Sequence, residues 1–210
     1  MSSSAETLLM VPHDLNRFIP ILRDTDHGEM LILPDYPLTV KHIADIYHKD
    51  PRGGALITGQ PGNGKTTFLA YLLGVLLSLD DSPDEHTKLC SAPILLYTPT
   101  VKILFYDGQV YTPSDPKNFH FDYIPSPVYS EPMPPVCVLI NMGMAEEPEE
   151  PKGIYESQCV IFPVQAASPN PILYWHWVDR RTAAMIGLPL WTEDQLLCGF
   201  IYTIRYTTQH

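Results

Sequence analysis

Apolar runs alternate along the chain with segments rich in glycine, proline and charged residues. A short run at 54–58 precedes a glycine-rich segment, and a helix-length run at 68–77 follows it. Further short apolar runs occupy 93–98, 136–141 and 158–165. Runs of strand length without polar alternation are typical of strands buried on both faces of a parallel sheet. We therefore expect an α/β fold in which a mainly parallel sheet lies between two layers of helices.

Three longer segments of the chain predict helices. The run at 68–77 is apolar on nearly every face, which predicts a helix that is covered on both sides. Residues 38–49 carry apolar side chains on one side and predict a second helix, preceded by a turn at 34–37. Residues 172–186 predict a third, and Thr192 is placed to cap a short helix that follows it.

Two connections add to the picture. Asp107-Gly108 between two β-rich runs predicts a β-hairpin insertion. Residues 112–135 contain seven prolines and predict a long proline-rich loop. These signals divide the chain into an N-terminal arm, residues 1–52, and a single domain, residues 53–210, that contains the long loop.

The glycine-rich segment matches a phosphate-binding loop. It fits the pattern G-x-x-x-x-G-K-[ST] without a gap, and it lies between the expected strand and the expected helix, as that pattern requires. A chance match on a structural turn is the alternative, which the two flanking elements disfavour. The fold expected is therefore the three-layer sandwich of P-loop NTPases. The candidate cofactor-binding residues are Gly59, Gln60, Pro61, Gly62, Asn63, Gly64, Lys65, Thr66 and Thr67.

Each part of this loop has a chemical role in such a site. Glycines allow backbone N–H groups to curve around a phosphate at the start of a helix, where the helix dipole also favours an anion. Lys65 supplies a positive charge for the β- and γ-phosphates. Thr66 offers a hydroxyl to Mg²⁺, which makes it the candidate metal ligand, and Thr67 is a candidate for the α-phosphate.

Hydrolysis needs a second group of residues. In P-loop enzymes a later buried strand usually ends in an acid that holds Mg²⁺ or primes the attacking water. Here the run at 136–141 ends in Asn141, which can bind metal-bound water but brings no negative charge. Glu146 and Glu147 are the nearest acids, in a proline-broken charge run through Glu150 that is typical of a solvated loop. These three residues are the weak catalytic candidates.

Two polar residues follow the next expected strand. Gln165 ends the run at 158–165, and Ser168 comes three residues later. A polar side chain at such a strand end can sense the γ-phosphate, so both are candidate sensors. An ordinary turn explains the two residues equally well.

Composition narrows the range of partners. The net charge of −11 leaves no broad basic surface for nucleic acid or an anionic membrane. No apolar run reaches membrane-spanning length, and the N-terminal residues lack the features of a secretory signal. We expect a soluble intracellular protein, cytoplasmic or nuclear. Its four widely spaced cysteines are expected to be mostly buried thiols, with a disulfide pair as the alternative: Cys90, Cys137, Cys159 and Cys198.

Three segments together resemble a known family. They are 56–69 around the loop, 162–171, which begins Phe-Pro-Val-Gln, and 188–193, Leu-Pro-Leu-Trp-Thr-Glu. They resemble the P-loop ATPase module of Crinkler and retrotransposon-hotspot-like proteins, over about residues 30–198. The resemblance implies nucleotide bound at the carboxyl ends of parallel strands. It also implies an ATPase often coupled to a nuclease-like domain and, in some members, a role as a nuclear effector.

The chain departs from that family in two ways. Members tend to carry an aspartate where this chain has Asn141, and the chain stops at His210, before a later Gly-Gly-x-Pro-Arg segment and any nuclease domain. The resemblance therefore carries nucleotide binding to this chain better than hydrolysis, and it suggests a truncated relative.

The leading hypothesis is a domain that binds ATP with Mg²⁺, hydrolyses it weakly or not at all, and serves as a truncated or regulatory relative of those ATPases. Its protein partner is unidentified. One alternative is an active ATPase in which a loop glutamate replaces the missing aspartate. A second is a small-molecule phosphotransferase, although such enzymes usually present several arginines and this chain has six. The last alternative is a decayed site that binds no ligand. The loop contacts phosphates only, so GTP is as compatible with it as ATP.

Overall fold

The computed structural model describes residues 8–10, 29–78, 89, 92–99, 101–113, 135–141, 160–170 and 174–197. Its helices and strands, in chain order, are β1 (Leu8–Met10), β2 (Glu29–Leu31), α2 (Asp35–Lys49), β3 (Ala55–Thr58), α3 (Lys65–Leu77), β4 (Ile94–Tyr97), β5 (Lys102–Tyr106), β6 (Gln109–Tyr111), β7 (Val136–Asn141), β8 (Ile161–Ala166), α5 (Trp175–Arg180) and β9 (Ala184–Gly187).

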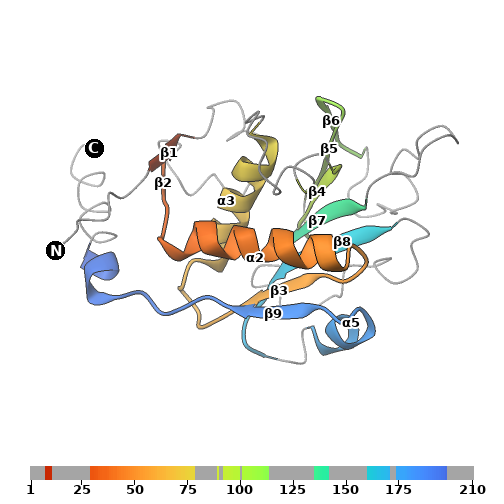
Figure 1. The fold of residues 1–210 in the computed structure, drawn as a ribbon. Coiled ribbons are helices and arrows are strands. Elements are labelled where there is room, and N and C mark those ends of the chain that lie inside the picture. Colours follow the sequence, from red (N-terminus) through yellow and green to blue (C-terminus); the bar gives the residue numbers. More distant parts are fainter. Residues whose placement is uncertain are drawn as a thin grey trace, which may run out of the picture.

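Seven strands form one mixed sheet in the order β6-β5-β4-β7-β8-β3-β9 (Figure 1). The five consecutive strands β4, β7, β8, β3 and β9 of this order all run parallel to one another. β5 and β6 continue the sheet beyond β4 as antiparallel strands. β1 and β2 form a separate antiparallel pair. The mainly parallel sheet and the hairpin insertion expected from the sequence are therefore confirmed.

The hairpin owes its turn to two residues with left-handed backbone. Asp107 has φ 50° and Gly108 has φ 67°. Two-residue hairpin turns of the type that matches strand twist require positive φ at both central positions, which glycine and aspartate tolerate best.

Alternate residues of the strands face two separate layers. Cys137 and Leu139 of β7 lie in the core cluster that contains α2 and α3, whereas Val138 and Ile140 lie in a cluster on the opposite face. Around Leu56, that opposite face packs against α5. Helices thus contact both faces of the sheet, which is compatible with a three-layer sandwich.

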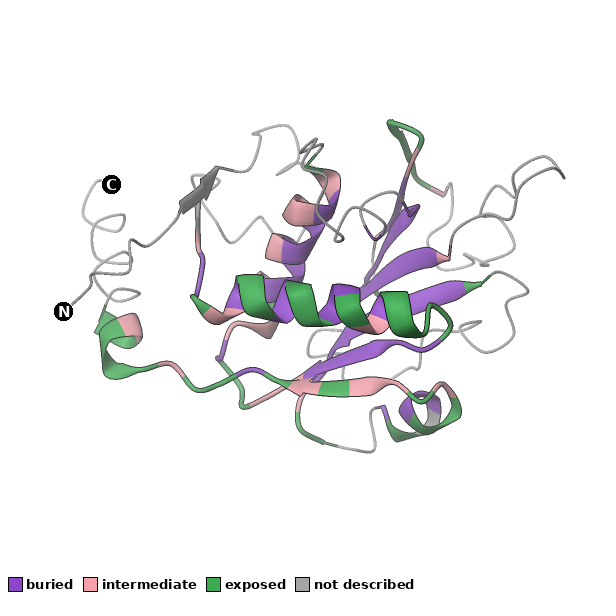
Figure 2. Ribbon diagram, in the orientation of Figure 1, coloured by how far each residue is buried: buried purple, intermediate pink, exposed green. Residues whose placement is uncertain are grey.

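The helix α3 is covered on nearly all sides, as its sequence predicts. Apart from Thr66, every residue of α3 is buried or half-buried (Figure 2). Its apolar side chains pack against the sheet and against α2 in one cluster. An apolar surface of this extent is stable only when it is removed from water on several sides.

The helix α2 begins three residues earlier than the sequence pattern suggests. The expected turn at 34–37 is instead the first turn of the helix, where Pro37 is tolerated because the N–H that it lacks has no partner there. Tyr36, Ile43 and Tyr47 are buried in the same cluster as α3 and the sheet. This part of the N-terminal arm therefore contributes directly to the main core.

The expected helix at 172–186 is wrong over its second half. α5 ends at Arg180, and Thr182 takes φ 50°, a backbone conformation that no α-helix can contain. The chain then forms β9, whose first N–H, on Ala184, donates a hydrogen bond of 2.9 Å to the carbonyl oxygen of Gly54. Pairing with β3 outweighs the weak helical pattern of these residues.

Among the described residues, no helix combines the length and the apolar character that crossing a bilayer requires. Cys137 is buried in β7 and is not in a disulfide. The other three cysteines lie outside the described residues, as does most of the expected proline-rich loop.

Candidate functional site

The glycine-rich segment forms a tight loop between β3 and α3. Gly59, Gly62 and Gly64 all have positive φ, at 148°, 83° and 82°. Gly64 is the residue immediately before α3, whose first turn has no side-chain cap and no acidic residue. The first N–H groups of a helix have no partner within it. The loop thus places unsatisfied donors and the positive end of a helix dipole together.

Two of these glycines are required by close neighbours as well as by their backbone angles. A Cβ on Gly59 would lie 2.1 Å from Asn63 Nδ2, and one on Gly64 would lie 2.4 Å from the hydroxyl oxygen of Tyr36. A Cβ on Gly62, by contrast, would meet nothing within 4 Å. The loop is therefore packed tightly at its two ends and open at its middle.

Lys65 folds back over the loop. Its Nζ donates hydrogen bonds to the carbonyl oxygens of Gly59 and Gln60, both at 2.8 Å, and to Asn63 Oδ1 at 3.1 Å. Partial burial lowers the pKa of Lys65 below the ordinary range of a lysine. The ammonium group is thus held among neutral oxygens, and an anionic oxygen would be a better partner for it.

Asn63 connects the loop to a distant part of the chain. Its side chain is buried, and Nδ2 donates a hydrogen bond of 3.0 Å to the carbonyl oxygen of Leu188, just after β9. Leu188 N in turn donates to the carbonyl oxygen of Thr58 at 2.8 Å. The segment after β9 therefore runs beside the loop, and two hydrogen bonds fix it there.

Two buried polar atoms near this segment have no hydrogen-bond partner within the described part of the chain. They are Thr58 Oγ1, at the end of β3, and Trp191 Nε1. Trp191 packs against the main core, and its Cζ2 lies 3.8 Å from the position of a Cβ on Gly64. Burying such atoms unpaired carries a free-energy cost.

Tyr36, in the first turn of α2, contacts the other side of the loop. Its hydroxyl donates a hydrogen bond of 2.8 Å to the carbonyl oxygen of Gly64. The sequence analysis did not identify this residue, because the contact joins positions that lie 28 residues apart and belongs to no motif. Only a correct prediction of where α2 begins would have suggested from the sequence that Tyr36 belongs to this helix.

The chain reverses its course across the sheet at this loop. After β3 it passes through α3, on one face, to β4, which lies beyond β8 and β7. After β8 it passes through α5, on the opposite face, to β9 on the other side of β3. In open α/β sheets, ligands bind outside the carboxyl ends of strands at such a reversal. The loop at 59–64 follows the carboxyl end of β3 at that point.

Asn141 ends β7 at the same edge of the sheet. It is in register with Ala166 of β8, which is in register with Ile57 of β3. Alternation with Cys137 and Leu139 puts Asn141 on the face that α3 covers. The catalytic candidate Asn141 therefore lies on the same side of the sheet as the loop.

The two candidate sensors lie in different surroundings. Gln165 is buried on the α5 face, where its Oε1 accepts a hydrogen bond from Trp177 Nε1. Ser168 lies two residues beyond β8, half-buried, at the carboxyl edge. A sensing role for Gln165 would require it to leave Trp177, whereas Ser168 needs no such change.

The candidate acids Glu146 and Glu147 lie outside the described residues. In the described ranges, no three His, Cys, Asp or Glu side chains gather as a metal site would require. The polar residues at the ends of the parallel strands β3, β4 and β7 are Thr58, Thr98 and Asn141, and none of these brings a negative charge.

Comparison of the chain with protein-family models, with curated proteins and with solved structures gives no match.

Proposed function

We propose that this chain binds a nucleoside triphosphate, ATP together with Mg²⁺, through the loop at 59–67 and hydrolyses it weakly or not at all. The backbone of the loop supports this proposal most strongly. Three glycines with positive φ lead into α3, whose first turn has neither a capping side chain nor an acid. Unpaired N–H groups at the start of a helix form a site for phosphate.

The side chains of the loop fit the same ligand. Phosphate oxygens would replace the neutral oxygens that now surround Lys65 Nζ, and hydrogen bonds to ionised groups are the stronger kind. Thr66 is exposed at the start of α3, so its hydroxyl is available to a metal ion. When bound, Mg²⁺ would neutralise part of the phosphate charge. The side chains of the loop therefore support the same ligand as its backbone.

The position of the loop in the fold gives independent support. It lies where the chain reverses its course across the sheet. The three segments that resemble the Crinkler-type module, far apart in sequence, also meet here. Asn63 bonds to Leu188, and Ala167 N donates a hydrogen bond of 3.0 Å to the carbonyl oxygen of Ile57.

Asn141 is the reason to expect little hydrolysis. It lies at the carboxyl edge, on the face that bears α3, where a carboxylate would serve to hold Mg²⁺ or to orient water. A neutral amide can accept a hydrogen bond from metal-bound water but cannot remove a proton from it. The site as described thus supports binding better than turnover.

Lys65→Ala tests the proposal at its central contact. This variant should lose measurable ATP binding, because the only side-chain cation of the loop is removed and each charged hydrogen bond contributes roughly 1.5–3 kcal/mol. Lys41→Ala is the matched control, since it removes the same charge from an exposed position of α2. Equal ATP affinity for the two variants in isothermal titration calorimetry would exclude the loop as the binding site.

A further inference from the structure

Tyr36 contacts the loop where the loop becomes a helix. The carbonyl oxygen of Gly64 accepts two hydrogen bonds, one of 2.8 Å from the Tyr36 hydroxyl and one of 2.7 Å from Phe68 N. The N–H on the other side of the same peptide group belongs to Lys65. Because a trans peptide is planar, with C=O and N–H pointing in opposite directions, fixing the carbonyl also fixes the N–H. Tyr36 therefore sets the direction of the first N–H of α3.

The Tyr36 hydroxyl keeps its proton at neutral pH. Burial raises the pKa of Tyr36 well above its usual range. The phenol therefore remains a donor to the carbonyl oxygen of Gly64.

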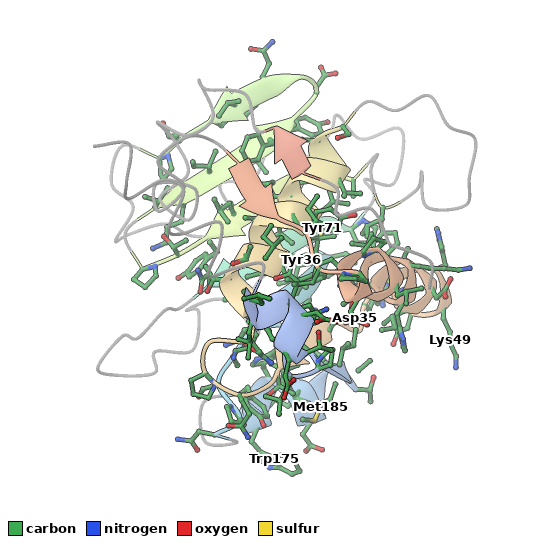
Figure 3. All side chains as sticks on the ribbon, turned by 90° about the vertical axis from the view of Figure 1, so that its left-hand side faces the viewer. Asp35, Tyr36, Lys49, Tyr71, Trp175 and Met185 are labelled. Carbon is green, nitrogen blue, oxygen red and sulfur yellow. The ribbon has the colours of Figure 1, made fainter. Side chains whose placement is uncertain are left out.

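Tyr36 is held rigidly enough to impose this geometry. Its side chain is 1% exposed, and its ring lies 5.3 Å from that of Phe68 and 5.6 Å from that of Tyr71, both on α3. Figure 3 shows Tyr36 and Tyr71 side by side where the start of α2 meets α3. A fully buried ring between two others has little freedom to follow a moving loop.

We propose that Tyr36 is a positioning residue of the phosphate site, aiming the Lys65 N–H from outside the loop motif. This inference rests on the proposed function. It extends the site from the loop to α2, so the segment before residue 53 becomes part of the binding machinery.

Tyr36→Phe tests the inference because it removes only the hydroxyl and keeps the ring. Tyr71→Phe is the matched control, since it removes a hydroxyl from a ring of the same aromatic cluster. We expect Tyr36→Phe to weaken binding of Mg·ATP and of inorganic tripolyphosphate about ten-fold, and Tyr71→Phe to change both less than about two-fold. Thermal unfolding of each variant separates this effect from a loss of stability.

The stabilisation that a bound ligand provides is a readout that a structural role alone would not change. Tripolyphosphate at one fixed concentration should raise the unfolding midpoint of the unchanged protein and of Tyr71→Phe, and it should raise that of Tyr36→Phe clearly less, because the ligand binds this variant more weakly. Should Tyr36→Phe not fold, Tyr36→His keeps a ring at this position and tests the same contact.

The outcomes separate this inference from the function on which it rests. If the unchanged protein binds neither Mg·ATP nor tripolyphosphate, the proposed function fails and the role of Tyr36 fails with it. If the unchanged protein binds and Tyr36→Phe binds within two-fold of it, only the positioning role is overturned. An equal ligand-induced rise in midpoint for Tyr36→Phe and Tyr71→Phe would overturn it in the same way.

Discussion

Lys65 shows how the loop prepares a single residue for an anion. Its ammonium group is surrounded by two carbonyl oxygens and an amide oxygen, and partial burial lowers its pKa. A bound phosphate would favour the charged form and raise that pKa again. Binding of ATP and protonation of Lys65 are therefore linked, and each favours the other.

This linkage predicts how affinity depends on pH. ATP should bind with full affinity at pH values below the pKa of Lys65 in the empty loop. The affinity should then fall as pH rises through that value, starting earlier than for an ordinary lysine. Titration calorimetry without Mg²⁺, between about pH 7.5 and about pH 10, measures this decline. An affinity that stays constant over that range would contradict the account.

Lys65→Arg serves as the comparison for the pH series, because a guanidinium stays charged over the whole range. Whatever its absolute affinity, this variant should show a flatter pH profile than the unchanged protein.

At the scale of single residues, the sequence predicted the loop glycines and Lys65, because their spacing is a local motif. It could not predict Tyr36 or the Asn63 contact with Leu188. These contacts join positions 28 and 125 residues apart. They depend on how α2 and β9 pack, which no local pattern encodes. The loop was therefore predictable, and most of what holds it in shape was not.

At the scale of elements, the site depends on the contact between the loop and the segment that follows β9. Asn63 carries this contact with both ends of its side-chain amide, donating to Leu188 and accepting from Lys65. Leu188 is buried. If the Asn63 side chain were removed, water could not easily replace it as the donor to the Leu188 carbonyl oxygen.

Asn63→Ala should therefore destabilise the fold as well as the site. Leaving a buried carbonyl without its partner costs about 1–3 kcal/mol, and about 2–4 °C in unfolding midpoint per kcal/mol is expected for a chain of this size. Gln60→Ala, an exposed position in the same loop, should change the midpoint by less than about 1 °C. Differential scanning calorimetry measures the unfolding midpoints of the two variants. Equal midpoints would refute a structural role for Asn63.

The elements also show where sequence patterns succeed. β7 was predicted with its bounds because an uninterrupted apolar run of that length is typical of a doubly buried strand. A capping arrangement was also predicted correctly at Thr192, whose hydroxyl accepts a hydrogen bond of 3.2 Å from Gln195 N. β9 was missed because Ala184–Gly187 has no pattern of its own and is defined by its pairing with β3.

At the scale of the whole molecule, buried tyrosines join α2 to α3 and to the sheet. Tyr36 contacts Phe68 and Tyr71 on α3, and the Tyr47 ring lies 5.1 Å from that of Phe162 on β8. Burial raises the pKa of Tyr47 to about 12 and also raises the pKa values of Tyr36 and Tyr71. These phenols ionise more readily in the unfolded chain than in the folded one.

This difference predicts alkaline instability. The tyrosine contribution to the free energy of unfolding should be complete below about pH 10, where phenols of the unfolded chain begin to ionise. It should fall as pH rises further, because only the unfolded state then releases these protons. Urea unfolding at intervals from about pH 8 to about pH 11.5 tests this. A free energy of unfolding that is unchanged above pH 10 would show that the tyrosines ionise freely in the folded protein.

The overall architecture was predictable to the extent that it depends on buried strands. The runs of apolar residues specified a mainly parallel sheet, and Asp107-Gly108 specified the hairpin. The order of the strands was not predictable, since it follows from which crossover covers which face. That order is what brings Asn141, Ser168 and the loop to one edge of the sheet.

The most direct test of the account is a titration of the purified protein with labelled ATP, with and without Mg²⁺, in which phosphate release is followed in the same samples. The account predicts saturable binding, strengthened by Mg²⁺ and accompanied by little or no phosphate release. Rapid release of phosphate would contradict the role given to Asn141. An absence of binding under both conditions would contradict the central claim that this loop is a nucleotide site.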